Sequence, residues 1–84
     1  MLLRVDKPLT RRVQEAVLRL IRVRNYQPGE KVPTEAELGQ LFGVGRSTLR
    51  EAIGNLVEQG ILQKSHGRGT FLRQLPIVLE SGLE

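Results

Sequence analysis

The sequence predicts a mainly α-helical fold of three helices with a small β-hairpin in a two- to three-stranded antiparallel sheet. Two short amphipathic patterns flank the glycine turn at residues 43–45, and the second pattern opens with basic and hydroxyl residues. A polar, glycine-rich hairpin pattern follows around residues 65–69. Two helices joined by a tight turn and followed by a hairpin are typical of a winged helix-turn-helix domain.

The first helix is expected from Leu9 to Arg24. Apolar residues recur there at spacings of three and four, which places them on one helical face, and four arginines and Glu15 lie on the opposite face. Pro28 and Gly29 follow and prevent the helix from continuing. Residues 1–8 show no clear period and are interpreted as an N-terminal lead-in.

A second helix is predicted at residues 35–42. Thr34 and Glu37 form a capping box, in which each side chain accepts a hydrogen bond from the backbone amide of the other residue. The preceding residues 31–33 are too short for more than an extended connector or a single edge pairing. The apolar residues expected to be buried in this helix are Leu38, Leu41 and Phe42.

A third helix is expected at residues 46–59, with Val44 as an apolar plug in the turn before it. Gly60 stands where a left-handed helix cap belongs. Strands at residues 61–64 and 70–73 then flank the hairpin tip. The residues expected to be buried in the third helix are Leu49, Ala52, Ile53, Leu56 and Val57.

The composition indicates one small domain with an excess of positive charge. The 84 residues include thirteen Lys and Arg and nine Asp and Glu, for a net charge of +4. Such an excess serves either ordinary solubility or a polyanionic partner. The sequence has no cysteine, which excludes disulfides and thiolate metal sites. It has no secretory or membrane-spanning pattern, so we expect a cytoplasmic location and no membrane partner.

The start of the third helix carries the strongest candidates for DNA contact. Arg46 and Arg50 are four residues apart and share a helical face, with Ser47 beside them. The planar fork of an arginine matches a phosphate or the O6/N7 edge of guanine. A solvated basic face, paired with Glu51 and Glu58, is the alternative. The position directly after a helix and a turn favours DNA.

Other candidates lie at the second helix and at the hairpin. The helix N-terminus capped by Thr34 offers free amides to a phosphate, although Thr34 is equally well explained as a cap alone. His66, Gly67 and Arg68 are small or cationic and suit a minor groove or a phosphate backbone, with simple turn chemistry as the alternative. Lys64 is expected beside a phosphate or on a solvated face of the hairpin.

The sequence offers little support for an enzyme. Ser47 and Thr48 have no His–Asp partner nearby, and residues 67–70 lack the lysine and the glycine spacing of a nucleotide-binding loop. His66 is the single histidine and has no ligand-type cluster around it. We therefore expect no catalytic residue, no cofactor site and no metal site.

Residues 9–73 resemble the N-terminal DNA-binding domain of GntR-type bacterial transcription regulators. The matching runs are residues 28–38, 42–52 and 66–72, with Leu56 and residues 60–62 between them. The triplet at residues 50–52, Arg-Glu-Ala, is most similar to the FadR-type branch, whose members carry an all-helical effector-binding domain after a linker.

The resemblance implies that Arg46 and Arg50 contact operator bases and phosphates. It implies that His66 and Gly67 reach the minor groove and that Thr48 lies near the DNA backbone. Two positions depart from the family pattern: Ala36 stands where the family often has an arginine, and Gly45 where it usually has serine or threonine. The second helix therefore lacks one expected contact, while glycine is still an acceptable cap.

The resemblance also implies partners beyond this sequence. These are a near-palindromic double-stranded DNA operator, a second copy of the full-length protein in a homodimer, and a small-molecule effector. The effector would bind only a C-terminal domain that follows the linker at residues 74–84. Repression is the expected sign of regulation. The alternatives are a winged-helix module that binds protein or RNA, and the DNA-binding head of a fused aminotransferase-like regulator.

Overall fold

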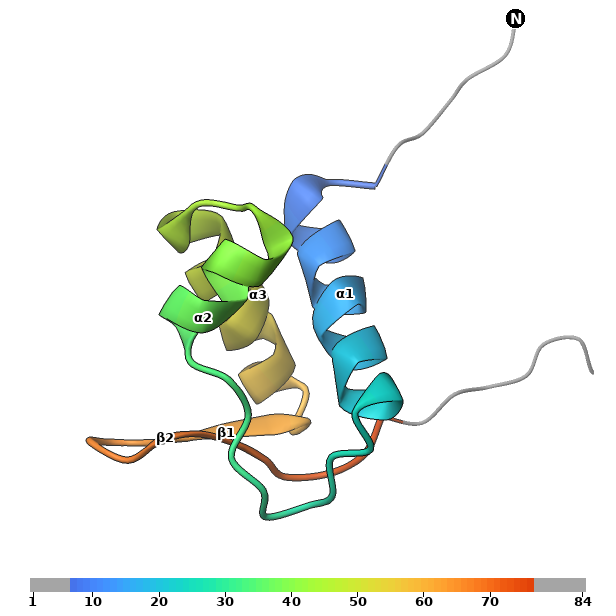
Figure 1. The fold of residues 1–84 in the computed structure, drawn as a ribbon, viewed down its shortest axis with the longest axis vertical. Helices are drawn as coiled ribbons and strands as arrows, with labels where there is room; N and C mark the ends of the chain where they lie inside the picture. Colours follow the sequence, from blue (N-terminus) through green and yellow to red (C-terminus); the bar gives the residue numbers. More distant parts are fainter. Residues whose placement is uncertain (1–6, 77–84) are drawn as a thin grey trace, which may run out of the picture.

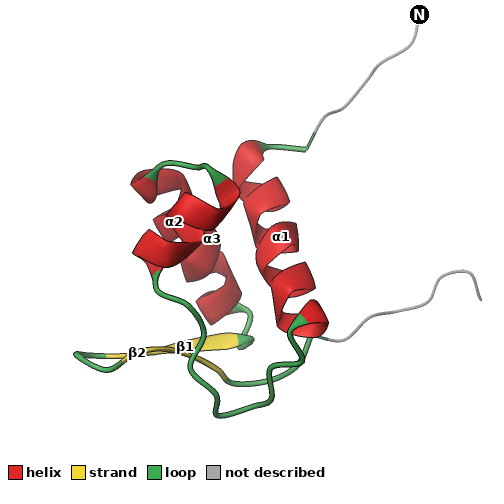
Figure 2. Ribbon diagram, viewed as in Figure 1, coloured by secondary structure: helices red, strands yellow, loops and turns green. Residues whose placement is uncertain are grey.

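The fold is taken from a computed structural model, which describes residues 7–76. Most of the predicted lead-in at 1–8 and most of the predicted linker at 74–84 lie outside the described residues. The described residues form three helices and a two-stranded hairpin, as the sequence predicts, and Figures 1 and 2 show the helices above the hairpin. The elements in chain order are α1 (Leu9–Val23), α2 (Glu35–Phe42), α3 (Arg46–Glu58), β1 (Leu62–Ser65) and β2 (Gly69–Leu72).

The core lies where α1, α3 and the hairpin meet. α3 packs against α1, α2 and β1, and it therefore joins all the parts of the domain. Burying one leucine or isoleucine side chain in this core stabilises the folded state by about 1.5–3 kcal/mol. Val57, predicted to be buried, is half-buried and packs against the edge of this core. The fully buried side chains include Val17, Ile21, Leu38, Leu49, Ile53, Leu56, Leu62 and Leu72.

α2 begins at the predicted capping box. The Thr34 hydroxyl accepts a hydrogen bond from the Glu37 amide at 3.1 Å, and the Glu37 carboxylate accepts one from the Thr34 amide at 2.8 Å. The prediction that Leu41 is buried is wrong: Leu41 is 52% exposed, whereas Leu38 is 1% exposed. α2 packs mainly on α3, so only the side of α2 that carries Leu38 and, partly, Phe42 is covered.

The turn between α2 and α3 follows the predicted glycines. Gly43 caps α2 with φ 68°, a left-handed conformation that a side chain would strain. Gly45 is the N-cap of α3 in an extended conformation, and it has no side chain to hydrogen-bond the first amides. Val44 between them is half-buried against the core, in keeping with its predicted role.

Both strands of the hairpin lie one residue nearer to its tip than predicted. β1 and β2 pair antiparallel from Leu62–Leu72 to Ser65–Gly69, whereas the sequence placed the strands at residues 61–64 and 70–73. The pairing of the two strands continues up to Ser65 and Gly69. Only three residues therefore remain in the tip. Lys31 forms a single antiparallel bridge to Phe71, so of the two alternatives for residues 31–33 the single edge pairing is the one that forms. No helix within residues 7–76 is long and apolar enough to cross a membrane.

Candidate nucleic-acid interface

The first turn of α3 presents the predicted cations to solvent. Arg46, Ser47 and Arg50 are exposed, and Thr48 is half-buried. Leu49, in the same turn, is completely buried and fixes the rotation of the helix. The core contact of α3 therefore determines that both arginines point outward from one face.

The hairpin tip consists of His66, Gly67 and Arg68, all exposed. The Arg68 amide donates a hydrogen bond to the Ser65 carbonyl at 2.9 Å, which closes the tight turn. In Figure 1 the tip projects beyond the helices on the left of the view, the side on which α3 also begins. The fold thus brings the two predicted DNA-contacting segments to one side of the molecule.

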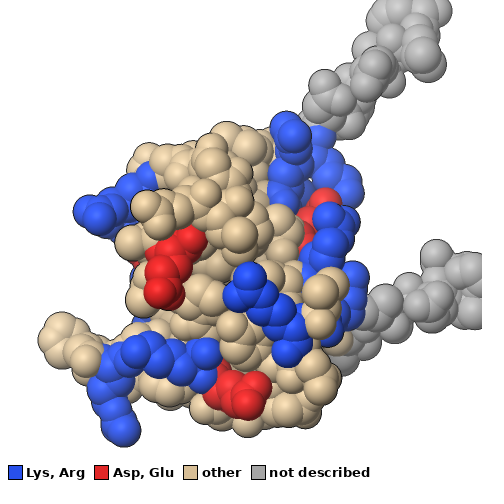
Figure 3. Space-filling model, viewed as in Figure 1, with Lys and Arg blue, Asp and Glu red and all other residues tan. Residues whose placement is uncertain are grey.

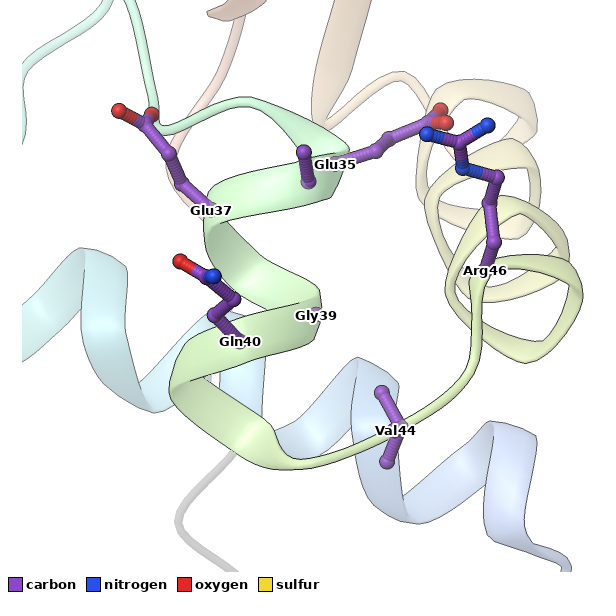
Figure 4. Close-up of a pocket in the computed structure, with 7 residues that line it drawn as sticks. Glu35, Glu37, Gly39, Gln40, Val44 and Arg46 are labelled. Atoms are coloured by element: carbon purple, nitrogen blue, oxygen red, sulfur yellow. The ribbon is translucent and has the colours of Figure 1, made fainter.

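The N-terminus of α2 lies between these two segments. One shallow hollow between α2 and the start of α3 is lined by Ala36, Gln40 and Arg46 among others, and a second, between α2 and the hairpin, is lined by Thr34, Ser65 and others. Figure 4 shows the first hollow, with the side chains of Glu35 and Arg46 extending toward each other from the two helices. Thr34, Arg46 and the tip consequently line one continuous edge, which we call the reading edge: the first turns of α2 and α3 and residues 64–68.

Lys64 already has an anionic neighbour within this edge. Its ammonium lies 2.9 Å from a Glu35 carboxylate oxygen, and both side chains remain partly exposed. An exposed pair of this kind contributes at most about 1 kcal/mol, so a phosphate could still compete with Glu35 for Lys64. The contact of Lys64 with DNA stays a prediction, and the sequence reasoning missed its pairing with Glu35.

Lys31 lies beside the hairpin, close to the reading edge, and is a second feature that the sequence reasoning missed. Its aliphatic chain lies over Gly69, and a Cβ atom at Gly69 would come within 2.6 Å of the Lys31 Cε. The Val32 amide donates a hydrogen bond to the Thr70 carbonyl at 2.9 Å and ties this segment to β2. The predicted edge pairing of residues 31–33 was the signal that could have placed Lys31 beside the hairpin.

Comparisons with protein families and curated proteins agree on one family. The model of the bacterial regulatory proteins of the gntR family matches residues 9–72. The mannosyl-D-glycerate transport/metabolism system repressor MngR of Escherichia coli is 40% identical over 68 residues, which cover 81% of this chain and 28% of that protein. The HTH-type transcriptional repressor NagR of Bacillus subtilis is 37% identical over 65 residues, or 77% of this chain and 27% of that protein. The chain therefore spans little more than a quarter of these relatives.

Solved structures show the same fold. The AraR(DBD) structure, determined in complex with operator ORR3, is 42% identical with a TM-score of 0.76, and the match covers 86% of this chain and 87% of that chain. The Streptococcus agalactiae GntR structure is 38% identical with a TM-score of 0.73, over 77% of this chain and 31% of that chain.

Proposed function

This chain belongs to the GntR family of bacterial regulatory proteins, and we propose that it is the sequence-specific DNA-binding domain of a transcriptional repressor. The observation that carries the proposal is the reading edge. It joins outward-facing arginines at the start of α3 to an exposed cationic hairpin tip on one side of the fold. The AraR(DBD) structure, of the same fold, was determined with an operator bound.

In the proposed complex, the N-terminal half of α3 enters the major groove. Arg46 and Arg50 contact bases and phosphates there, Ser47 lies beside them, and Thr48 lies near the backbone. This assignment is supported by the exposure of Arg46, Ser47 and Arg50 and by the burial of Leu49 in the same turn. Because Gly45 and Ala36 add no polar side chain, sequence readout from the turn and from α2 is reduced relative to the family pattern.

The hairpin tip and α2 contact the DNA on either side of α3. His66 and Gly67 reach the minor groove, with Arg68 along the phosphates. The capping box uses the amides of Thr34 and Glu37, and the amides between them remain available to a phosphate. Thr34 therefore fixes the start of α2 through the capping box, and the backbone amides contact the phosphate.

The further partners are proposed from the relatives. MngR and NagR are named repressors and are several times longer than the matched segment. We infer that this domain acts in a homodimer on a near-palindromic operator, with an effector bound by a separate C-terminal domain. A module that binds protein or RNA is the alternative, but a protein-binding module would need no cations at both the helix and the hairpin tip.

The test is an anisotropy titration of the 84-residue chain with duplexes from the upstream region of its gene, at two salt concentrations. We expect tight binding to one duplex, with an affinity that falls steeply as salt rises. The double variant Arg46→Ala/Arg50→Ala should bind that duplex no better than an unrelated one. Salt-independent binding, or wild-type affinity in the double variant, would contradict the assignment.

A further inference from the structure

The positive charge of this chain is concentrated away from the reading edge. Residues 7–24 contain six Lys and Arg and one carboxylate, whereas residues 25–76, which include the whole reading edge, contain six Lys and Arg and five carboxylates. Figure 3 shows the same separation: Lys and Arg line the right-hand side over α1, and smaller groups lie at the left. Long-range attraction to a polyanion therefore comes mainly from α1.

Four arginines form this surface, which we call the α1 arginine face. Their spacing places them on the side of α1 opposite the buried Val13, Val17 and Ile21, and all four are exposed. The outermost two are eleven residues apart, or about 16 Å along the helix. The residues of the face are Arg11, Arg12, Arg19 and Arg22.

The single carboxylate on this face is already neutralised. The Lys7 ammonium donates a hydrogen bond to Glu15 at 2.7 Å, and this bond, more than any other cause, lowers the pKa of Glu15 below its usual value. Within residues 7–76, none of the four arginines forms a salt bridge with a carboxylate. The face thus carries four guanidinium groups along one helix, and its one carboxylate, between Arg12 and Arg19, is paired with Lys7.

We propose that the α1 arginine face binds a second segment of DNA through its phosphates, without reading sequence. This inference rests on the proposed function and adds a second DNA site to it. A duplex carries one negative charge per about 1.7 Å of its axis, so a row about 16 Å long meets several phosphates. Arginine is the side chain best suited to bind phosphate oxygens in pairs.

DNA fits this face better than an acidic protein surface. The exposed large apolar residues of α1, Leu9 and Val23, lie at the two ends of the helix and not among the arginines. Protein interfaces are built around apolar or aromatic anchors at their centre, and this row has none there. A chain that binds one DNA segment at the reading edge and another at α1 could transfer from one segment to the other without first dissociating.

The test measures binding of the 84-residue chain to a 20-base-pair duplex of unrelated sequence over a range of salt concentrations. In Arg12→Gln/Arg19→Gln/Arg22→Gln, the salt slope should fall by about 0.9 for each lost phosphate contact. The charge-preserving control Arg12→Lys/Arg19→Lys/Arg22→Lys should keep most of the binding. The Arg46→Ala/Arg50→Ala variant should also keep most of the binding to this duplex. This variant therefore distinguishes an error in the present inference from an error in the proposed role of the reading edge.

A second measurement tests for simultaneous binding. Energy transfer between a donor-labelled upstream duplex and an acceptor-labelled unrelated duplex should appear with the wild-type chain and disappear with the triple glutamine variant. Unchanged binding and energy transfer in that variant would overturn the proposal. Binding of poly-L-glutamate that depends on the α1 arginines, without binding of the unrelated duplex, would also overturn it and identify an acidic protein as the partner.

Discussion

The reading edge and the α1 arginine face are both cationic, but they differ in how the charge is held. On α1, four arginines follow one straight helix face, and the one carboxylate there is paired with Lys7. At the reading edge, cations alternate with two carboxylates, several hydroxyls and Gly67 on three different elements. A uniform row of charge gives attraction to any polyanion, whereas cations at fixed, separate positions among neutral groups can distinguish one base sequence from another.

The two surfaces should differ most in their effect on DNA affinity when one arginine is removed from each. Arg50→Ala should weaken binding to the upstream duplex by about 1–3 kcal/mol, because a base contact is lost. Arg19→Ala, on the α1 face, should change that affinity less than about twofold, since exposed charges this far from the DNA are screened by salt. Fluorescence anisotropy with both variants checks this. Equal losses would mean that the reading edge does not read sequence.

A substitution in the hairpin should disturb the shape of the reading edge while leaving α1 intact. Gly69 has φ 123°, a backbone conformation that a residue with a side chain rarely adopts, so Gly69→Ala should lower the free energy of unfolding by about 1–3 kcal/mol. Gly67→Ala is the matched control: its φ is 74° and a Cβ atom would meet nothing within 4 Å. Thermal unfolding should rank Gly69→Ala as the less stable variant. The reverse order would show that Lys31 moves aside freely.

Removing a carboxylate should affect the two surfaces differently. Glu35→Gln releases Lys64 at the reading edge and removes a negative charge beside the bound phosphates, so affinity for the upstream duplex should rise a few-fold, or by up to about 1 kcal/mol. Glu15→Gln, the matched change on α1, should leave that affinity within about twofold, since this charge lies too far from the duplex. If Glu35→Gln weakens binding, the Glu35–Lys64 pair positions the hairpin for DNA.

The smallest expected effect is at the start of α3. Gly45 is extended with φ −73° and nothing lies within 4 Å of a Cβ atom there, so a serine fits without strain. Gly45→Ser should raise the free energy of unfolding by a few tenths of a kcal/mol to about 1 kcal/mol, because its hydroxyl can accept from the first amides of α3. Gly45→Ala, which adds a Cβ atom but no hydroxyl, is the control and should not give this gain. Thermal unfolding of both variants checks the prediction.

Local patterns predicted most of the fold. The capping residues Thr34 and Glu37 placed the start of α2, and the apolar spacing placed α1 and α3 to within one residue. Leu41 was mistaken for a core residue because periodicity shows which residues share a side of a helix, and not how much of that side another element covers. The strand bounds were misplaced by one residue because the ladder continues to Ser65 and Gly69 at the tip and begins only at Leu62 and Leu72.

The sequence by itself determined the helices, the turn, the hairpin and the outward position of Arg46 and Arg50, because these follow from propensity and spacing along a single segment. Only the tertiary structure decided which segments meet. It placed the start of α3 and the hairpin tip on one side, put Glu35 against Lys64 and Lys31 over Gly69, and set the α1 arginines apart from all of them. Such contacts join residues distant along the chain, and they depend on packing around one shared core.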